Sequence, residues 1–421
     1  MTTQTFSPVT RFAMRATFLY LVFYVYPYGF EYIYAISDRE VFSFWPSLTV
    51  PFAKWFFGWE IDMETTRNGF DSMYDFSRFA LIGLMALVGS AIWMLIERST
   101  RRTVDGWLWS FTRTLLRYHV GFTLIMYGVA KVVPIQFGSL DLNTMETTLG
   151  EQTGMQFLWN FMSYSRFYAG ISGWIEVIGG ILLLFRRTTL AGAVLTAIAM
   201  TNVVLLDIGY DVSVKMFAVH LFLMNLVILG PHYRMFWQVL IQQKAVAPTQ
   251  ESTRFTDRLG RAYLPIKGIL LLAFAITSIT EHRDILEQVT GGDMQYAQHI
   301  DVTLHVVNGD TLAGPDKNQF WKSITVSPWS YYPNWLQVKQ PDNPYNYYVF
   351  TMDTVQQTIE FYPSRGDSTD LYQFQYREEE NTVTWEGTHG TDTLYLEGTR
   401  KRLEDYRLSR APMWVRDLKT D

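Results

Sequence analysis

The carboxylate of Glu176 lies in the middle of an apolar stretch that is long enough to cross a membrane. About twenty residues, at 1.5 Å each, span the roughly 30 Å of hydrocarbon in a bilayer. A charged group at that depth is costly, so it normally faces a partner or a cavity. Glu176 could therefore carry a proton or anchor the headgroup of a quinone. It could equally form a structural hydrogen bond between helices, with Tyr127, Asn202 or His220 as the partner.

Other polar side chains gather near the outer ends of the neighbouring apolar stretches. Counting 1.5 Å per residue places Asn202 about 8 Å and His220 about 10 Å below the outer surface, and Tyr127 lies at a similar depth. The residues expected around the outer mouth are Lys131, Gln136, Arg166, Asp207, Tyr210, Asp211 and Lys215. We expect a polar site in the outer half of the membrane, with Glu176 and His220 as its candidate catalytic groups and the others as binding residues.

Simpler roles are available for several of these charges. Asp211 and Lys215 are four residues apart and can pair at the start of a helix. The Lys131 side chain can extend to the lipid headgroups. Arg113 and Arg117, on the inner side, fit anchors on cytoplasmic phosphates. These interpretations leave the mid-membrane carboxylate as the strongest indication of function.

The sequence excludes several cofactors. The chain has no Cys, which removes disulfides, thiolate nucleophiles, Cys-ligated zinc and iron–sulfur clusters. The two membrane histidines, His119 and His220, are predicted in opposite leaflets, with depths about 10 Å apart at 1.5 Å per residue, which argues against a b-type haem. No His-x-x-x-His pair, Gly-rich phosphate loop or nucleophile elbow is present. We therefore name no metal ligands, and a quinone is the one cofactor that the sequence suggests.

Seven apolar stretches are candidate membrane spans, and the polar site would lie among them. They are residues 12–35, 76–96, 114–133, 164–185, 190–206, 214–229 and 264–280. A cleaved signal peptide is an alternative for the first, but its core is rich in Tyr and Phe, which argues against cleavage. The segments between these stretches differ in their Lys and Arg content. Lys and Arg are concentrated in alternate segments, such as 98–113 and 234–267, whereas the segments 135–163 and 207–213 have none. The positive-inside rule then predicts a cytoplasmic N-terminus, and seven spans place the C-terminus outside.

The pattern changes from helical to alternating after about residue 295. Val302, Leu304 and Val306 are predicted to share one face of a strand, as are Tyr372 and Phe374. The paired positions of the later strands are Ile324 and Val326, Ile359 and Phe361, Val383 and Trp385, and Leu394 and Leu396. Turn signals every 8–15 residues separate these strands, which predicts an antiparallel barrel or sandwich. Residues 1–291 carry a net charge of +2 and residues 292–421 carry −7, which argues against a nucleic-acid binder.

Residues 106–230 resemble the DoxX/DoxD-like family of small bacterial membrane proteins. The resemblance rests on short motifs in a fixed order: YGVAK at 127–131, LWNFM at 158–162, Glu176 before Gly179 and Gly180, LLLFRR at 182–187, and YDVSVK at 210–215 before His220. It extends to long members that add membrane segments and a C-terminal β domain. At the end of the chain, Ala411 and Pro412 stand where those members have a Gly–aromatic pair.

The resemblance implies a four-helix membrane bundle at 106–230. Around it we expect N-terminal membrane segments with an aromatic outer loop at 1–105, a cytoplasmic loop at 231–263, a last span and linker at 264–290, and an extracytoplasmic, lipocalin-like β domain at 291–421. Some relatives are subunits of a thiosulfate:quinone oxidoreductase, which implies a quinone-linked role and other membrane subunits as partners.

Two functions remain open from the sequence. In the first, a protein of the bacterial cytoplasmic membrane serves a quinone-linked redox system through the polar site. In the second, the chain is a non-enzymatic membrane anchor whose outer β domain binds a lipid, a small hydrophobe or a partner protein. Transport is a weaker hypothesis, because we find neither inverted repeats nor paired broken helices.

Overall fold

The computed structural model describes residues 7–25, 44–63, 71–100, 105–133, 135–138, 140–246, 260–290, 297–312, 320–326, 334–341, 345–364 and 369–409. The chain divides into two compact units, each described by itself. We call the first, Met1–Gln136 with Phe167–His282, the helical unit. The second, Phe137–Arg166 with Arg283–Asp421, is the barrel unit. Ala411 and Pro412, where the sequence departs from the family pattern, lie outside the described residues.

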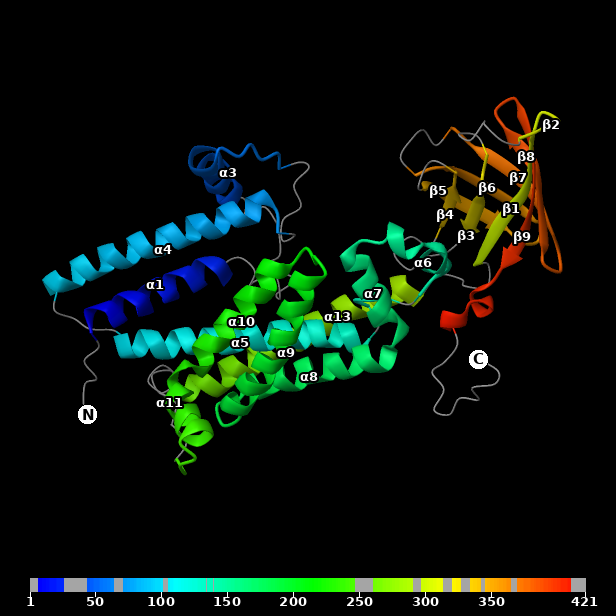
Figure 1. Ribbon diagram of the computed structural model, residues 1–421. Helices are drawn as coiled ribbons and strands as arrows, with labels where there is room; N and C mark the ends of the chain where they lie inside the picture. Colours follow the sequence, from blue (N-terminus) through cyan, green and yellow to red (C-terminus); the bar gives the residue numbers. More distant parts are fainter. Residues whose placement is uncertain are drawn as a thin grey trace. The chain divides into compact units, whose positions relative to one another are not determined.

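The helical unit consists mainly of long helices (Figure 1). Its elements are α1 (Pro8–Val25), α3 (Phe44–Phe57), α4 (Met73–Thr100), α5 (Asp105–Val132), α8 (Arg166–Leu184), α9 (Thr189–Gly209), α10 (Lys215–Leu229) and most of α13 (Tyr263–Thr290). After α10, the chain continues through η4 (Gly230–His232), α11 (Tyr233–Phe236) and η5 (Trp237–Ile241), and η6 (Gly260–Ala262) precedes α13.

Four helical segments among the described residues are long and apolar enough to cross a membrane: Met73–Glu97, Arg166–Leu184, Thr189–Gly209 and Lys215–Ile241. They coincide with four of the predicted stretches. The other three predicted stretches overlap α1, α5 and α13, which are not among these four segments. Residues 26–35 of the first stretch lie outside the described residues. One physical reason is that α5 carries Arg113, Arg117 and Lys131, which lower its hydropathy. Seven spans therefore remain a prediction.

Large apolar side chains cover the outside of α8, which supports its assignment to a membrane. At least 37% of each of these side chains is exposed, and an aqueous surface disfavours so continuous an apolar face. They are Phe167, Tyr168, Ile171, Trp174, Ile175, Ile178 and Ile181. The helix thus presents its apolar side outward and Gly173, Gly179, Gly180 and Glu176 inward, as expected of a helix in lipid.

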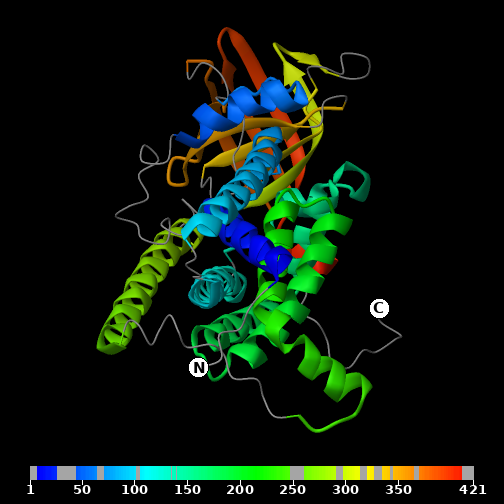
Figure 2. The same cartoon turned by 90° about the vertical axis from the view of Figure 1, so that its left-hand side faces the viewer.

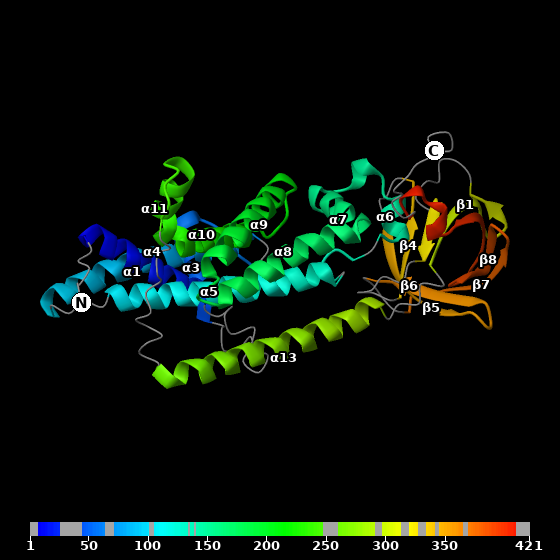
Figure 3. The same ribbon diagram turned by 90° about the horizontal axis from the view of Figure 1, so that it is seen from below.

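Helices α5 and α8 lie side by side (Figure 3). Two pairs of glycines bring their backbones into contact. A Cβ on Gly173 would lie 2.5 Å from the carbonyl oxygen of Gly128, and a Cβ on Gly180 would lie 2.6 Å from that of Gly121. Gly121 and Gly128 are seven residues apart, as are Gly173 and Gly180, so the antiparallel helices touch at two points on one seam. Small residues permit such close packing in membranes, where lipid offers no hydrophobic drive for helices to associate.

Basic side chains at the other end of this bundle bind the last carbonyl groups of helices. Arg113 donates to the carbonyl oxygen of Ile228 at 3.1 Å, and Arg117 donates to that of Leu183 at 3.0 Å. The last carbonyls of a helix lack partners within the helix and carry partial negative charge, so a cation there is favourable. Both arginines are buried. The prediction that they anchor on phosphates is therefore wrong.

The strands form a closed antiparallel barrel (Figure 2). They are β1 (Gln298–Val307), β2 (Asp310–Thr311), β3 (Ser323–Val326), β4 (Trp335–Lys339), β5 (Asn346–Asp353), β6 (Thr358–Pro363), β7 (Tyr372–Glu379), β8 (Thr382–His389) and β9 (Asp392–Lys401). Among the described residues, β2 pairs only with β1, and β1 pairs with β9 to close the remaining eight strands. Of the two predicted alternatives, the structure has the barrel.

Aromatic side chains fill the inside of the barrel. Phe361 and Trp385 are almost fully buried, and Phe361 contacts the rings of Trp321, Tyr348 and Phe374. An eight-stranded barrel is just wide enough for its own side chains to fill it. The packed interior therefore argues against a lipocalin-like ligand cavity.

A β-bulge alters the predicted face of β1. The register shifts between Val302 and Leu304, so Val302 packs in the core while Leu304 is only partly buried. Beyond the bulge, His305 is buried and its ring lies 5.5 Å from that of Trp321. The prediction that Val302 and Leu304 share a face is therefore wrong, because one extra residue reverses the alternation. The other predicted strand pairs do lie in the core.

A helical insertion between α5 and α8 belongs to the barrel unit, although the predicted bundle at 106–230 included it. It comprises α6 (Leu142–Glu146), η3 (Leu149–Glu151) and α7 (Gly154–Tyr164). Glu151 accepts hydrogen bonds from Lys339 at 3.0 Å and from Tyr345 at 3.2 Å. The bond from Lys339 lowers the pKa of Glu151 to about 2. Polar contacts thus attach the insertion to the outside of the barrel.

Candidate functional site

A buried ion pair between Lys131 and Glu176 is the centre of the candidate site. Only 8% of the Lys131 side chain and 2% of the Glu176 side chain are exposed. Lys131 lies in the last turn of α5, where the Cα–Cβ bond points back toward the start of the helix. Its Cβ lies 2.9 Å from the position that a Cβ on Gly173 would occupy. The glycine contact therefore brings the lysine stem alongside α8, and the ammonium reaches Glu176 one turn further on.

The ion pair lines a small cavity inside the helical unit, with a volume of about 60 Å³. Its polar lining comes from Tyr127, Lys131, Gln136, Glu176 and Asp207, and its apolar lining from α5, α9, α10 and the residue before α10. One water needs about 10–15 Å³ of such volume. The cavity can therefore hold a few waters, or one polar group of a larger molecule.

The charges in this cavity do not balance. Lys131 pairs with Glu176, and the second carboxylate, Asp207, is also buried and interacts with Lys131. If all three groups are ionised, they sum to −1. In addition, Glu176 Oε2 has no hydrogen-bond partner among the described residues. A buried acceptor without a partner costs free energy, so the site favours a proton or a hydrogen-bond donor.

The structure thus brings five of the sequence-predicted residues into one cavity: Tyr127, Lys131, Gln136, Glu176 and Asp207. It also decides between the structural alternatives for Glu176 and Lys131. Among the described residues, Lys131 pairs with Glu176, whereas His220 bonds to Tyr20 and Met216. The prediction that Lys131 extends to the headgroups is wrong, because its ammonium turns inward to the carboxylate.

Asp211 and Lys215 lie apart from this cavity. Lys215 pairs with Asp211 at 2.8 Å, as their spacing predicts. Asp71 accepts hydrogen bonds from the backbone N–H groups of Lys215 at 2.7 Å and Met216 at 3.0 Å. Asp71 therefore caps the start of α10 from a distant part of the chain. No sequence signal could reveal this cap, because 144 residues separate Asp71 from Lys215.

His220 faces α1 rather than the Glu176 cavity. Its Nε2 lies 2.6 Å from the hydroxyl of Tyr20 and its Nδ1 lies 2.6 Å from the carbonyl oxygen of Met216. Its ring stacks on Tyr24 at 4.3 Å between centroids. His220 also lines a separate, largely apolar groove of about 410 Å³ formed by α1, α4 and α10. The structure therefore separates the two groups predicted to be catalytic.

Asn202 and Arg166 are also outside the cavity. Asn202 is exposed on α9, and Arg166 is exposed at the start of α8, where it belongs to the barrel unit. A third group, which the sequence did not reveal, lies in the barrel unit and brings Glu146, His299 and Asp301 together.

The fold and the cavity define a class: a mainly helical membrane protein with a polar cavity between its helices and a β-barrel after them. Comparison with known proteins then gives the family. The chain is 32% identical to the "Uncharacterized protein YwoB" of Bacillus subtilis (strain 168) over 127 residues, which are 30% of this chain and 80% of that protein. It belongs to the same family as YwoB.

No family model and no solved structure matches the chain. The name of YwoB carries no activity, so the relationship brings none to this chain. The resemblance to DoxX/DoxD-like proteins is not tested by these comparisons and stays a prediction.

Proposed function

We propose that this protein lies in the bacterial cytoplasmic membrane and serves a quinone-linked redox system. In this proposal the N-terminus is cytoplasmic, the barrel is extracytoplasmic, and the Lys131–Glu176 cavity lies in the outer half of the membrane. Four apolar helices support the membrane assignment. The distribution of Lys and Arg in the sequence supports the orientation.

The observation that carries the proposal is the buried carboxylate with one oxygen unsatisfied. Glu176 Oε2 can accept a hydrogen bond from a hydroxyl, and Asp207 provides a second carboxylate in the same cavity. A quinol presents hydroxyl groups that become carbonyls when it is oxidised. Glu176 would accept the hydrogen bond of the hydroxyl form, and Lys131 would favour the negative charge left when a proton departs.

The size of the cavity restricts how a quinone could bind. A volume of about 60 Å³ admits a hydroxyl or carbonyl group with a few waters, but not a whole ring. The ring must then lie outside the cavity, and the partly exposed Tyr127 is the aromatic group at its edge. The chain has no Cys, so a thiol of this chain cannot be the redox partner of the quinone.

Quinone binding to the intact protein in lipid nanodiscs tests the proposal, with a short-chain naphthoquinol as the probe. We expect Glu176→Gln to weaken binding at least about tenfold, because a buried charged acceptor contributes about 1.5–3 kcal/mol. Asp211→Asn is the matched control, since Asp211 is exposed and lies outside the cavity. Equal affinity in a folded Glu176→Gln protein would contradict the proposal.

The alternative function is a non-enzymatic membrane anchor, and the structure favours only one of its two forms. A non-enzymatic anchor whose barrel binds a small hydrophobe needs space inside the barrel, and aromatic side chains occupy that space. The outer surface of the barrel remains available for a partner protein. A β domain that binds such a partner is compatible with a quinone site in the helical unit.

A further inference from the structure

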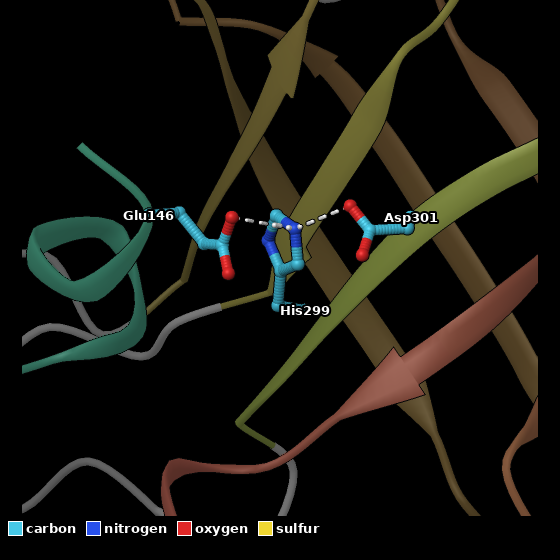
Figure 4. A group of neighbouring side chains, drawn as sticks. All are labelled: Glu146, His299 and Asp301. Carbon is cyan, nitrogen blue, oxygen red and sulfur yellow. Dashed lines mark hydrogen bonds and ion pairs between the residues drawn. The ribbon is translucent and has the colours of Figure 1, made fainter. Parts of the chain in front are cut away.

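Three metal-ligating side chains converge in the barrel unit (Figure 4). His299 Nε2 lies 3.4 Å from Glu146 Oε2 and 3.3 Å from Asp301 Oδ1. One ligand atom from each of the three residues lies within 4.8 Å of the others. None of these residues belongs to the helical cavity, and the proposed function does not use them.

The local fold explains why these side chains meet. His299 and Asp301 are two residues apart on β1, so they share its outer face, while Ile300 and Val302 pack into the barrel core. Glu146 ends the short helix α6 of the insertion. The insertion therefore covers the outer face of β1 at this point and leaves only 1% of His299 exposed.

The ring of His299 is held in one orientation. On the neighbouring strand, Thr325 lies directly opposite His299, and its hydroxyl is 2.8 Å from Nδ1. A hydroxyl can donate to an unprotonated Nδ1 or accept from a protonated one, so Thr325 fits either tautomer. Nε2 is thereby directed at the two carboxylates. Ligating histidines generally have such a fixed partner on the other ring nitrogen.

Polar partners also fix the orientation of the two carboxylates. Glu146 Oε1 accepts a hydrogen bond from Tyr406 at 2.5 Å and lies 3.3 Å from Lys401 Nζ. Asp301 Oδ2 lies 2.7 Å from the same ammonium. Each carboxylate therefore has one oxygen held by these outer groups, while its other oxygen faces His299 Nε2.

The spacing of the inward-facing atoms matches a small divalent cation. Zn²⁺ bonds to His nitrogen and carboxylate oxygen are about 2.0–2.2 Å, which gives about 3.3–3.6 Å between ligands at the corners of a tetrahedron. The two measured separations from Nε2 are 3.3 and 3.4 Å. Three protein ligands would leave the fourth corner for water.

We propose that Glu146, His299 and Asp301 form a binding site for a divalent transition-metal cation of the Zn²⁺ type. Tyr406 and Lys401 orient its two carboxylates from behind, and Thr325 orients the imidazole. Because one ligand comes from the insertion and two from β1, the cation fastens the insertion to the barrel. Binding therefore stabilises the barrel unit as well as occupying the site.

The test uses the full chain in detergent, stripped with a chelator and titrated with Zn²⁺ alone. Calorimetry should give a single strong site, and Zn²⁺ should raise the melting temperature followed by tryptophan fluorescence. His299→Gln and Asp301→Asn should each weaken Zn²⁺ at least about tenfold, since even outer partners of metal ligands change affinity 10–100-fold. Both variants should lose most of the Zn²⁺-induced rise in melting temperature.

A second His–carboxylate pair on the barrel provides the matched control. His389 Nε2 lies 2.5 Å from Asp370 Oδ1, but both side chains are substantially exposed and no third ligand joins them among the described residues. His389→Gln should leave Zn²⁺ affinity unchanged. The proposal is wrong if the wild-type chain shows no Zn²⁺ heat above that of the folded Asp301→Asn variant, or if His389→Gln has the larger effect.

Discussion

Lys131 and Glu176 depend on each other for their stability in an apolar environment. Removing one member of a buried ion pair leaves the other charge without compensation, whereas replacing both by apolar groups of similar size is often tolerated. Both side chains of the pair are buried, and they lie between two helices whose backbones are in contact. Its energetic role can therefore be separated from any functional role by comparing single and double variants.

We expect Lys131→Met to destabilise the helical unit by about 3–5 kcal/mol, because it leaves the Glu176 carboxylate buried and unpaired. The double variant Lys131→Met with Glu176→Leu should recover most of that loss. Denaturant unfolding in detergent measures both. The control is Lys54→Met, because Lys54 pairs with Glu60 on an exposed surface, where such a pair contributes at most about 1 kcal/mol. Equal losses in the free energy of unfolding for Lys131→Met and Lys54→Met would contradict a stabilising role for the buried pair.

The residue types in the cavity could be predicted from the sequence, but their partners could not. A mid-membrane acid stands out by composition alone, and depth counting found Tyr127, Lys131, Gln136 and Asp207 near it. Which faces of the helices meet depends on packing over long sequence separations. His220 shows the limit of depth counting, because its depth fits the site, whereas its contacts are with Tyr20, 200 residues earlier.

At the scale of elements, the contact between α5 and α8 positions the ion pair. The seam has glycine on both helices at two levels, and a larger residue there would push the helices apart. The sequence shows all four glycines as small residues within apolar stretches. Their pairing across the two helices required the structure, since a helix face is defined only once its neighbour is known.

Gly173→Ala should destabilise the helical unit by about 1–3 kcal/mol, because the added methyl meets the Gly128 carbonyl oxygen at 2.5 Å. Gly170→Ala on the same helix is the control, since a Cβ there meets nothing within 4 Å. Thermal unfolding in detergent compares the two. If Gly170→Ala proved as harmful as Gly173→Ala, close packing at the seam would not be the reason.

The insertion should loosen from the barrel in acid. Lys339 lowers the pKa of Glu151 to about 2, below its ordinary value of 4.5. The contribution of this contact is therefore complete above about pH 4.5 and disappears as the pH falls through about 2. Hydrogen exchange in η3 and α7 should accelerate over that window in the wild type. Glu151→Gln should remove this component, and an identical pH dependence in both proteins would refute it.

At the scale of the whole molecule, the chain combines a helical unit with a closed barrel. The change of sequence period near residue 295 was sufficient to predict helices followed by an antiparallel β domain, because apolar stretches of about twenty residues and strict alternation have different physical causes. The sequence left open whether that domain is a barrel or a sandwich, and the pairing of β1 with β9 shows the barrel. The insertion at 137–166 was missed, because its short helices sit between two apolar stretches and its attachment to the barrel depends on a few polar contacts.

The polar cavity and the quinone-linked role proposed for it lead to one central question, whether Glu176 exchanges a proton with a bound quinone. Infrared difference spectra of the protein in nanodiscs, recorded on adding quinone and then reducing it, detect such a carboxyl group directly. We predict a carboxyl band that is lost in Glu176→Gln and retained in Asp211→Asn. Identical difference spectra for the wild type and Glu176→Gln would contradict a proton-exchanging role for this carboxylate.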